Sequence, residues 1–275
     1  MSRRRANPQA AAGAVIVALF VTVALLAPML APQNPKTQNL SEDLRPPSIE
    51  HPCGQDKLGR DVLSRVIYGA RVSLLVGALV VGISASVGFA IGAAAGYAGG
   101  GTDELVMRGT DVLLAFPGIL LAIGVSAVLG PSLRNVLVAL CSIGWTGYAR
   151  LVRSEVLSYR EREFVIAAVA LGAQPLRVVT RHILPQLLTP LIVQATFGMA
   201  GAIVAEASLS FLGLGVQPPT PSWGAMVNEG RSFLLIAPHV ALFPGLALVL
   251  TVLGLNLLGD GLRDALDVRS RDPIP

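Results

Sequence analysis

The chain has 275 residues, of which 53% are hydrophobic and only 14% are charged, and its mean hydropathy is +0.64. A soluble domain carries about 25% charged residues, so this composition favours a membrane protein. The net charge of +4 comes mainly from arginines that fall between apolar runs. Nucleic-acid binding needs a contiguous basic face, so we expect no nucleic-acid partner.

Six runs of the sequence are candidates for transmembrane helices, which need about 20 apolar residues to cross a bilayer core of about 30 Å. In chain order, the predicted spans are 10–31, 72–102, 112–133, 135–149, 187–205 and 232–259. The fourth is the shortest, and it crosses only if the flanking Arg134 and Arg150 extend their side chains toward the interfaces. The predicted fold is an all-α membrane protein with six transmembrane helices.

The first run follows three arginines, Arg3 to Arg5, and a secretory signal peptide begins in the same way. The apolar region of a signal peptide is about 7–15 residues long, and this run is longer. We therefore expect residues 1–70 to hold an uncleaved anchor helix followed by an extracytoplasmic segment.

Residues 54–61, GQDKLGRD, have the glycine spacing of a phosphate-binding loop. Arg60 replaces the lysine of such a loop, however, and Asp61 replaces the hydroxyl residue that binds magnesium. No other such motif occurs, so we expect this chain to bind no nucleotide and to have no ATPase activity. Residues 51–71 are instead predicted to form an extracytoplasmic turn and an interfacial helix, in which Arg60, Asp61 and Arg65 pair at the headgroup level.

Three glycines of the second predicted span, Gly88, Gly92 and Gly96, recur every four residues and favour close packing of helix backbones. In the third span, Pro117 is expected to kink the helix. Near the fourth span, Trp145 suits either an aromatic anchor at the interface or the wall of a cavity.

Residues 161–186, EREFVIAAVALGAQPLRVVTRHILPQ, are predicted to form a hairpin of two short helices. Gly172 stands where the end of a helix favours left-handed φ, and Pro175 is placed to begin the second helix. Two apolar faces follow from helical spacing: Phe164, Ala167, Ala168 and Leu171 on the first helix, and Leu176, Val179 and Ile183 on the second, beside Arg177 and Arg181.

This hairpin has two interpretations from its pattern alone. It is either a rigid projection that docks on a partner, or an amphipathic loop whose arginines bind anionic lipid headgroups.

Two further segments follow the hairpin. Glu206, near the end of the fifth span, either lines a transport pathway or gate, or bonds to a neighbouring helix or the interface. Residues 217–224, QPPTPSWG, are expected to form a rigid extracytoplasmic loop.

The distribution of basic residues predicts the orientation, because cytoplasmic segments beside membrane spans are enriched in lysine and arginine. With both termini in the cytoplasm, the cytoplasmic segments that hold most of these residues are 1–9, 100–110, 150–186 and 261–275. Residues 71–264 then form the membrane core, and residues 265–275 form a cytoplasmic tail.

No set of residues suggests catalysis or a resident metal. Cys53 and Cys141 are predicted to lie at different depths and cannot bridge, and the three histidines are scattered. An intramembrane hydrolase is therefore disfavoured, and we expect no cofactor in this chain. A self-sufficient secondary transporter stays as an alternative, although such proteins are often built from repeats and the chain has no internal repeat.

Several motifs carry a family resemblance. Ala167-Ala168, Gly172 and Ile183-Leu184-Pro185 resemble the "EAA" loop of binding-protein-dependent ABC importer permeases, although Ile166 replaces the glutamate that gives the motif its name. Four longer segments resemble the C-type permease subunit of dipeptide, oligopeptide and nickel importers: 51–71, 111–123, 145–163 and 206–231.

This resemblance implies a type I ABC importer permease in the bacterial cytoplasmic (inner) membrane. It implies three kinds of partner besides the membrane lipid: a homologous second permease subunit, two ATPase subunits that bind ATP and magnesium, and an extracytoplasmic solute-binding protein. The expected substrates are short peptides, with nickel or another small solute as the alternative. The residues expected to couple to the ATPase are Ala167, Ala168, Leu171, Gly172, Ala173 and Arg177, and Glu206 and Trp145 are candidates for the pathway or gate.

Overall fold

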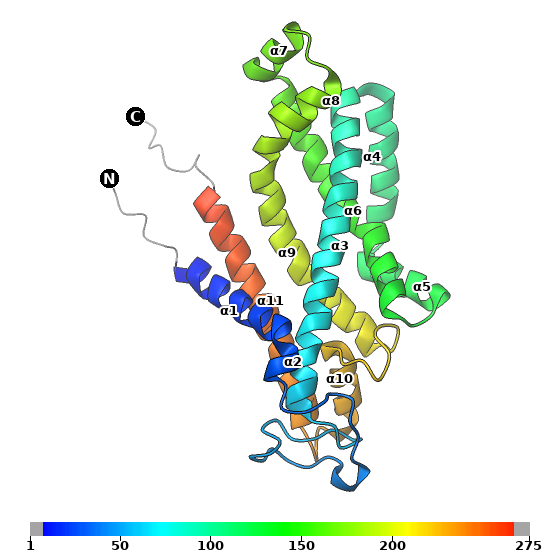
Figure 1. Cartoon of the computed structure of the whole chain (residues 1–275). Coiled ribbons are helices and arrows are strands. Elements are labelled where there is room, and N and C mark those ends of the chain that lie inside the picture. The colour runs from blue at the N-terminus through cyan, green and yellow to red at the C-terminus, as the bar shows by residue number, and fades with distance from the viewer. Residues whose placement is uncertain (1–7, 267–275) are drawn as a thin grey trace, which may run out of the picture.

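The computed structural model describes residues 8–266, and within that range it is helical, with no strand beyond an isolated β-bridge between Gln55 and Asp61. The predicted all-α fold is confirmed. Five long helices run along the molecule (Figure 1): α1 (Pro8–Leu25), α3 (Val62–Ala98), α6 (Leu133–Arg160), α9 (Leu184–Phe211) and α11 (His239–Leu266). The shorter elements are α2 (Ala27–Leu30), α4 (Gly100–Leu114), α5 (Gly118–Leu129), α7 (Glu163–Ala170), α8 (Pro175–Arg177) and α10 (Trp223–Gly230).

Within the described residues, five helical segments are long and apolar enough to cross a membrane, and the pair α4 and α5 makes a sixth if counted as one span. These two helices meet at an angle of 81°. The break falls at Pro117, the residue before α5. Proline has no backbone N–H and therefore cannot donate a helical hydrogen bond. The kink predicted at Pro117 is confirmed as a break between two helices, and the predicted span 112–133 covers only the last residues of α4 together with α5.

The start of α3 corrects the sequence prediction. The helix begins at Val62, so no separate interfacial helix precedes the span, and the residues up to Arg71 are its first turns. Arg65 is 2% exposed inside the helix because carboxylates of other segments neutralise it. Asp61 instead caps the helix, since its side chain accepts a 2.7 Å hydrogen bond from the backbone amide of Ser64.

The glycine stripe of α3 packs against α6, as predicted. A Cβ atom on Gly92 would stand 2.3 Å from the carbonyl oxygen of Ala149, and one on Gly88 would stand 2.5 Å from the Cβ atom of Tyr148. Only hydrogen fits at these positions, so α3 and α6 touch backbone to backbone.

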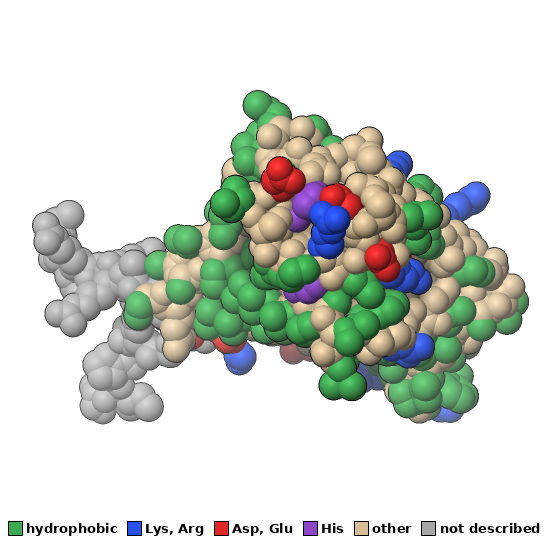
Figure 2. Space-filling model, turned by 90° about the horizontal axis from the view of Figure 1, so that it is seen from below, with side chains coloured by type: hydrophobic (Ala, Val, Ile, Leu, Met, Phe, Trp, Pro, Cys, Tyr) green, Lys and Arg blue, Asp and Glu red, His purple; other side chains and the backbone are tan. Residues whose placement is uncertain are grey.

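The two ends of the molecule differ in character. One end carries α7 and α8, and the other carries α10 and the non-helical segment after α2 (Figure 1). Seen from the α10 end, acidic, basic and histidine side chains gather near the middle of the face, with hydrophobic side chains beside them (Figure 2). The predicted cytoplasmic hairpin and the predicted extracytoplasmic loop therefore lie at opposite ends.

Candidate functional sites

The C-terminus of α7 is closed at Gly172 by two backbone hydrogen bonds and a left-handed residue. Gly172 has φ of +86°, the amide of Ala173 donates to the carbonyl of Ala168 at 3.0 Å, and the amide of Gly172 donates to the carbonyl of Val169 at 2.9 Å. These two bonds make a Schellman motif, which satisfies the last carbonyls of the helix. The left-handed conformation predicted at Gly172 is confirmed, and no neighbouring atom lies within 4 Å of where its Cβ would be.

The hairpin is fixed to the bundle through Val165, which the sequence analysis did not single out, and through Ala168 and Ile183, which it placed on the two apolar faces. Val165 is 1% exposed and joins a buried cluster with Val178 and Ile183, together with Val152 and Val156 of α6. Ala168 is also buried, and Ala173 packs at the edge of the same cluster. The inward face of α7 is therefore centred on Val165 and Ala168.

Val179 packs against the same cluster, whereas the remaining predicted positions face outward. Leu171 is 89% exposed, Leu176 is 75% exposed and Phe164 is 44% exposed, and Ala167 and Arg177 are exposed as well. We call the exposed apolar residues of this end the α7 tip: Phe164, Ile166, Val169, Leu171 and Leu176. Such a concentration of exposed large apolar side chains marks a contact surface.

The second arm of the hairpin is not an independent helix. Pro175 begins a helix as predicted, but α8 is only three residues long and continues through a π-helical turn, Val178–Ile183, into α9. The tip is thus joined directly to a membrane span. α8 is continuous with this span, whereas the corner at residues 171–174 separates α7 from it.

Glu206 lies in the interior of the described chain, 0% exposed. Its Oε1 accepts hydrogen bonds from the hydroxyls of Ser210 at 2.7 Å and Ser222 at 2.9 Å, and the hydroxyl of Ser73 lies 3.5 Å from its Oε2. These contacts tie α9 to α3 and to the residue that precedes α10. These bonds join Glu206 to neighbouring elements, as one of the two interpretations drawn from the sequence expects, and its assignment to a transport pathway or gate stays a prediction.

Trp145 is the other residue expected to line the pathway or gate. It lies on α6, partly exposed, and its indole N–H donates a 3.0 Å hydrogen bond to the carbonyl of Ser142 within the same helix. Its assignment to an aromatic anchor or to a cavity wall stays a prediction.

A buried charge cluster was missed by the sequence reasoning. Asp56 pairs with both Arg60 and Arg65, and Glu229 of α10 lies 2.8 Å from Arg60 Nη2 and 3.0 Å from Arg65 Nη1. The predicted pairing of Asp61 with these arginines is wrong, because Asp61 bonds instead to His51 Nδ1 at 2.9 Å. The alternating charges of residues 56–65 indicate ion pairs within this segment. They do not indicate Glu229 as a partner, because it is distant in the sequence.

The loop of residues 54–61, which has the glycine spacing of a phosphate-binding loop, folds around a carboxylate of its own. The side chain of Asp56 accepts hydrogen bonds from the amides of Leu58 and Arg60, at 2.8 and 3.1 Å, so a carboxylate already occupies the donors that would hold a phosphate. Across residues 8–266 no group of three or more potential ligands is placed to hold a metal ion. Cys53 and Cys141 are free thiols, as expected.

Comparison with known proteins agrees with this architecture. A model of the binding-protein-dependent transport system inner membrane component matches residues 88–272, and a model of the N-terminal transmembrane domain of oligopeptide transport permease C matches residues 1–47. A dipeptide transport system permease of Alkalihalophilus pseudofirmus is 46% identical over 265 residues, with 96% of this chain and 87% of the relative covered. Glutathione transport system permeases of Escherichia coli O157:H7 and Shigella boydii are each 48% identical over 266 residues, with 96% of this chain and 88% of the relative covered.

Proposed function

The chain belongs to the family of binding-protein-dependent transport system inner membrane components, and from this premise we propose that the α7 tip couples it to a cytoplasmic ATPase. The family and the relatives make it an inner-membrane permease subunit of a peptide importer. Membership also removes the alternative of a self-sufficient secondary transporter. The proposal adds the residues and the partners through which this subunit works.

The exposed α7 tip is the observation that carries the proposal. Its apolar side chains lie on α7, at the residue that follows it and on α8. The C-terminus of α7 is closed by a Schellman motif, and its inner face packs in a buried cluster. A rigid apolar helix of this kind suits insertion into a groove on a partner. Docking there lets movement of the ATPase subunits pull directly on α9, since α8 and the π-helical turn continue into it.

The assembly that follows has five members: this chain, a homologous second permease, two ATPase subunits and an extracytoplasmic binding protein. The two permeases share the translocation pathway, and nucleotide binding and hydrolysis by the ATPase subunits alternate its access between the two sides. For the substrate we propose short peptides, supported by relatives named for dipeptide and glutathione transport. Nickel stays the second candidate, with no relative among these named for it.

A matched pair of substitutions tests the coupling role. Leu171→Asp places a charge on the α7 tip, and Leu235→Asp makes the same change at a leucine that is 100% exposed near the opposite end. We expect Leu171→Asp to lower co-purification of the ATPase subunits and peptide-stimulated ATP hydrolysis by at least tenfold, whereas Leu235→Asp leaves co-purification unchanged. Normal ATPase recovery with Leu171→Asp would refute the docking assignment.

Two further measurements test activity and substrate. The purified chain alone is expected to hydrolyse no ATP, and turnover by the isolated subunit would contradict its role as a permease. For the substrate, cells lacking the gene should lose uptake of a labelled dipeptide and regain it on complementation. Loss of nickel uptake without loss of dipeptide uptake would favour the second candidate.

A further inference from the structure

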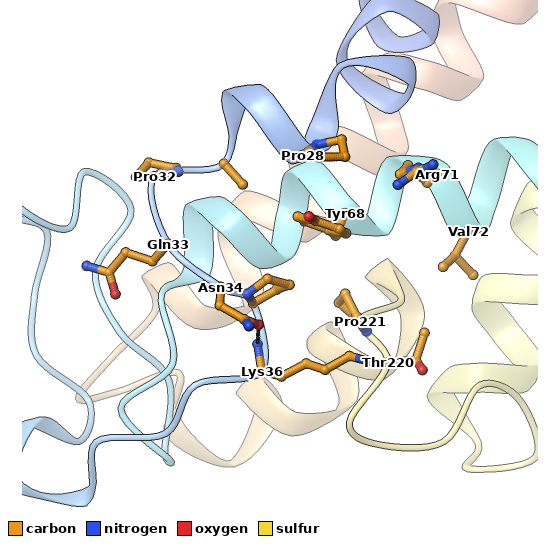
Figure 3. A pocket seen from close by; sticks show the side chains of 12 residues that line it. Pro28, Pro32, Gln33, Asn34, Lys36, Tyr68, Arg71, Val72, Thr220 and Pro221 are labelled. Carbon is orange, nitrogen blue, oxygen red and sulfur yellow. Dashed lines mark hydrogen bonds between the residues drawn. The ribbon is translucent and has the colours of Figure 1, made fainter.

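A polar pocket of about 700 Å³ lies at the α10 end, away from the α7 tip (Figure 3). Three segments that are distant in the sequence line it: residues 28–36 around the end of α2, residues 68–72 of α3, and residues 220–221 of the loop before α10. The polar side chains on its wall are Gln33, Asn34, Lys36, Tyr68, Arg71 and Thr220. The lining is thus rich in hydrogen-bonding groups and includes two cations but no acidic residue.

The two cations in this pocket form no ion pair with the residues that the structure describes. Arg45, Arg60 and Arg65 of the same segment each pair with a carboxylate. No such ion pair joins Lys36 or Arg71 to any residue within 8–266, and Figure 3 shows the Lys36 side chain extended toward Thr220. Two unpaired positive charges beside amide and hydroxyl groups make a site for an anion.

The location of the pocket indicates which kind of anion it binds. Arg71 is the last charged residue before the charge-free run 72–102. One turn further along α3, Leu75 is 53% exposed, and Met29, beside the pocket-lining Pro28, is 82% exposed. The pocket therefore lies where an exposed apolar surface gives way to a polar one, which is the level of lipid headgroups.

We propose that this pocket binds the phosphate headgroup of an anionic phospholipid. Lys36 and Arg71 contact the phosphate, the amide and hydroxyl side chains contact the polar part of the headgroup, and the acyl chains lie along the apolar surface beside Met29 and Leu75. Basic pockets beside transmembrane helices are suited to such headgroups. The proposal needs neither the coupling role of the α7 tip nor a particular orientation in the membrane.

Native mass spectrometry of the whole transporter complex tests this directly. The complex is delipidated in mild detergent and titrated with phosphatidylglycerol, or with phosphatidylcholine of the same acyl chains. Each basic residue beside an anionic lipid contributes about fivefold in affinity, so the double variant Lys36→Gln/Arg71→Gln should bind phosphatidylglycerol about 30-fold more weakly. The control is Lys57→Gln, which removes an exposed charge outside the pocket and should bind as the wild type does.

The outcomes separate the possible sources of the anion. Retention of phosphatidylglycerol by the wild type and by Lys57→Gln, together with its loss in the double variant, supports the site. Equal binding of both lipids, or equal binding by wild type and double variant, overturns it. Full displacement of the lipid by millimolar inorganic phosphate would assign the pocket to a free anion, and weakened association of the binding protein with unchanged lipid binding would assign it to acidic residues of that protein.

Discussion

The hydroxyl of Ser222 donates a 2.9 Å hydrogen bond to Oε1 of Glu206, joining the residue that precedes α10 to a carboxylate buried in α9. Ser210 donates to the same oxygen at 2.7 Å, and both serines are buried. The contact fixes the start of α10 against the membrane core. A carboxylate in a membrane span suggests a transport pathway, and these contacts add a structural role as a second expectation for Glu206.

Substitutions of Glu206 separate these two roles. Glu206→Gln keeps the acceptor for both serines, so we expect normal protein level and normal uptake. Glu206→Ala leaves buried hydroxyls without a partner, at a cost of about 1–3 kcal/mol for each, and should lower both the protein level and the midpoint of thermal unfolding. A Glu206→Gln protein present at normal level but unable to transport would instead assign the carboxylate to the pathway or gate.

The contact between Gly92 and Ala149 predicts a strong effect of added volume. Gly92→Val would force α3 and α6 apart, and overpacking of this kind costs about 1–3 kcal/mol or more. We expect a lower midpoint of thermal unfolding for the purified complex. Gly82→Val is the control, because no atom lies within 4 Å of a Cβ atom at that position; equal effects of the two changes would contradict the close packing.

The buried charge cluster predicts that Glu229 is important for stability. Glu229→Ala leaves Arg60 and Arg65, each 2% exposed, to share Asp56 alone. Removing one partner of a buried pair costs about 3–5 kcal/mol, so the variant should accumulate poorly. Glu104→Ala breaks an exposed pair with Arg108 and should change little, and similar levels of the two variants would argue against a structural role of the cluster.

The corner at Gly172 is tested by a glycine of the same conformation elsewhere. Gly172→Arg strains the left-handed corner by about 1 kcal/mol or more and places a bulky charge at the α7 tip, so it should leave insertion near normal but abolish peptide uptake. Gly213 ends α9 in the same motif, with φ of +80°, hydrogen bonds from Gly213 to Ser210 and from Leu214 to Leu209, and open space around it. Gly213→Arg therefore carries a similar strain without touching the tip, and it should retain association with the ATPase.

The alternative in which the hairpin lies on lipid makes the opposite prediction. An added arginine would strengthen binding to headgroups and leave transport intact. Wild-type uptake by the Gly172→Arg protein would therefore support lipid binding and rule out docking.

The orientation is tested by cysteine labelling. A cysteine at the exposed Ser158 should react with an impermeant maleimide only from the cytoplasm, and one at Thr220 only from outside; labelling of both from one side would refute the six-span arrangement. Cys53 and Cys141 are best replaced first. The background from Cys53 should be low at neutral pH in any case, because burial, with a smaller effect of Asp61, raises the pKa of this thiol and so depletes the thiolate.

Local features of this protein were determined by its sequence alone. The long apolar runs, the glycine stripe of α3, the kink at Pro117 and the left-handed corner at Gly172 depend on hydrophobicity, side-chain volume and backbone freedom. Each is a property of neighbouring residues, so each could be predicted without knowing what packs against it. The missing phosphate-binding loop belongs to the same class, since Arg60 and Asp61 are unsuitable wherever they lie.

Only the tertiary structure decided features that depend on distant partners. The start of α3 at Val62 was missed because the charges of 60–65 suggested an interface, whereas Glu229, 164 residues after Arg65, neutralises them inside the protein. Likewise, the apolar periodicity of α7 suits two neighbouring faces, and packing on α6 selects the one with Val165. Charge and periodicity restrict the contacts that a residue makes, but the residues that satisfy them are brought together only by the folded chain.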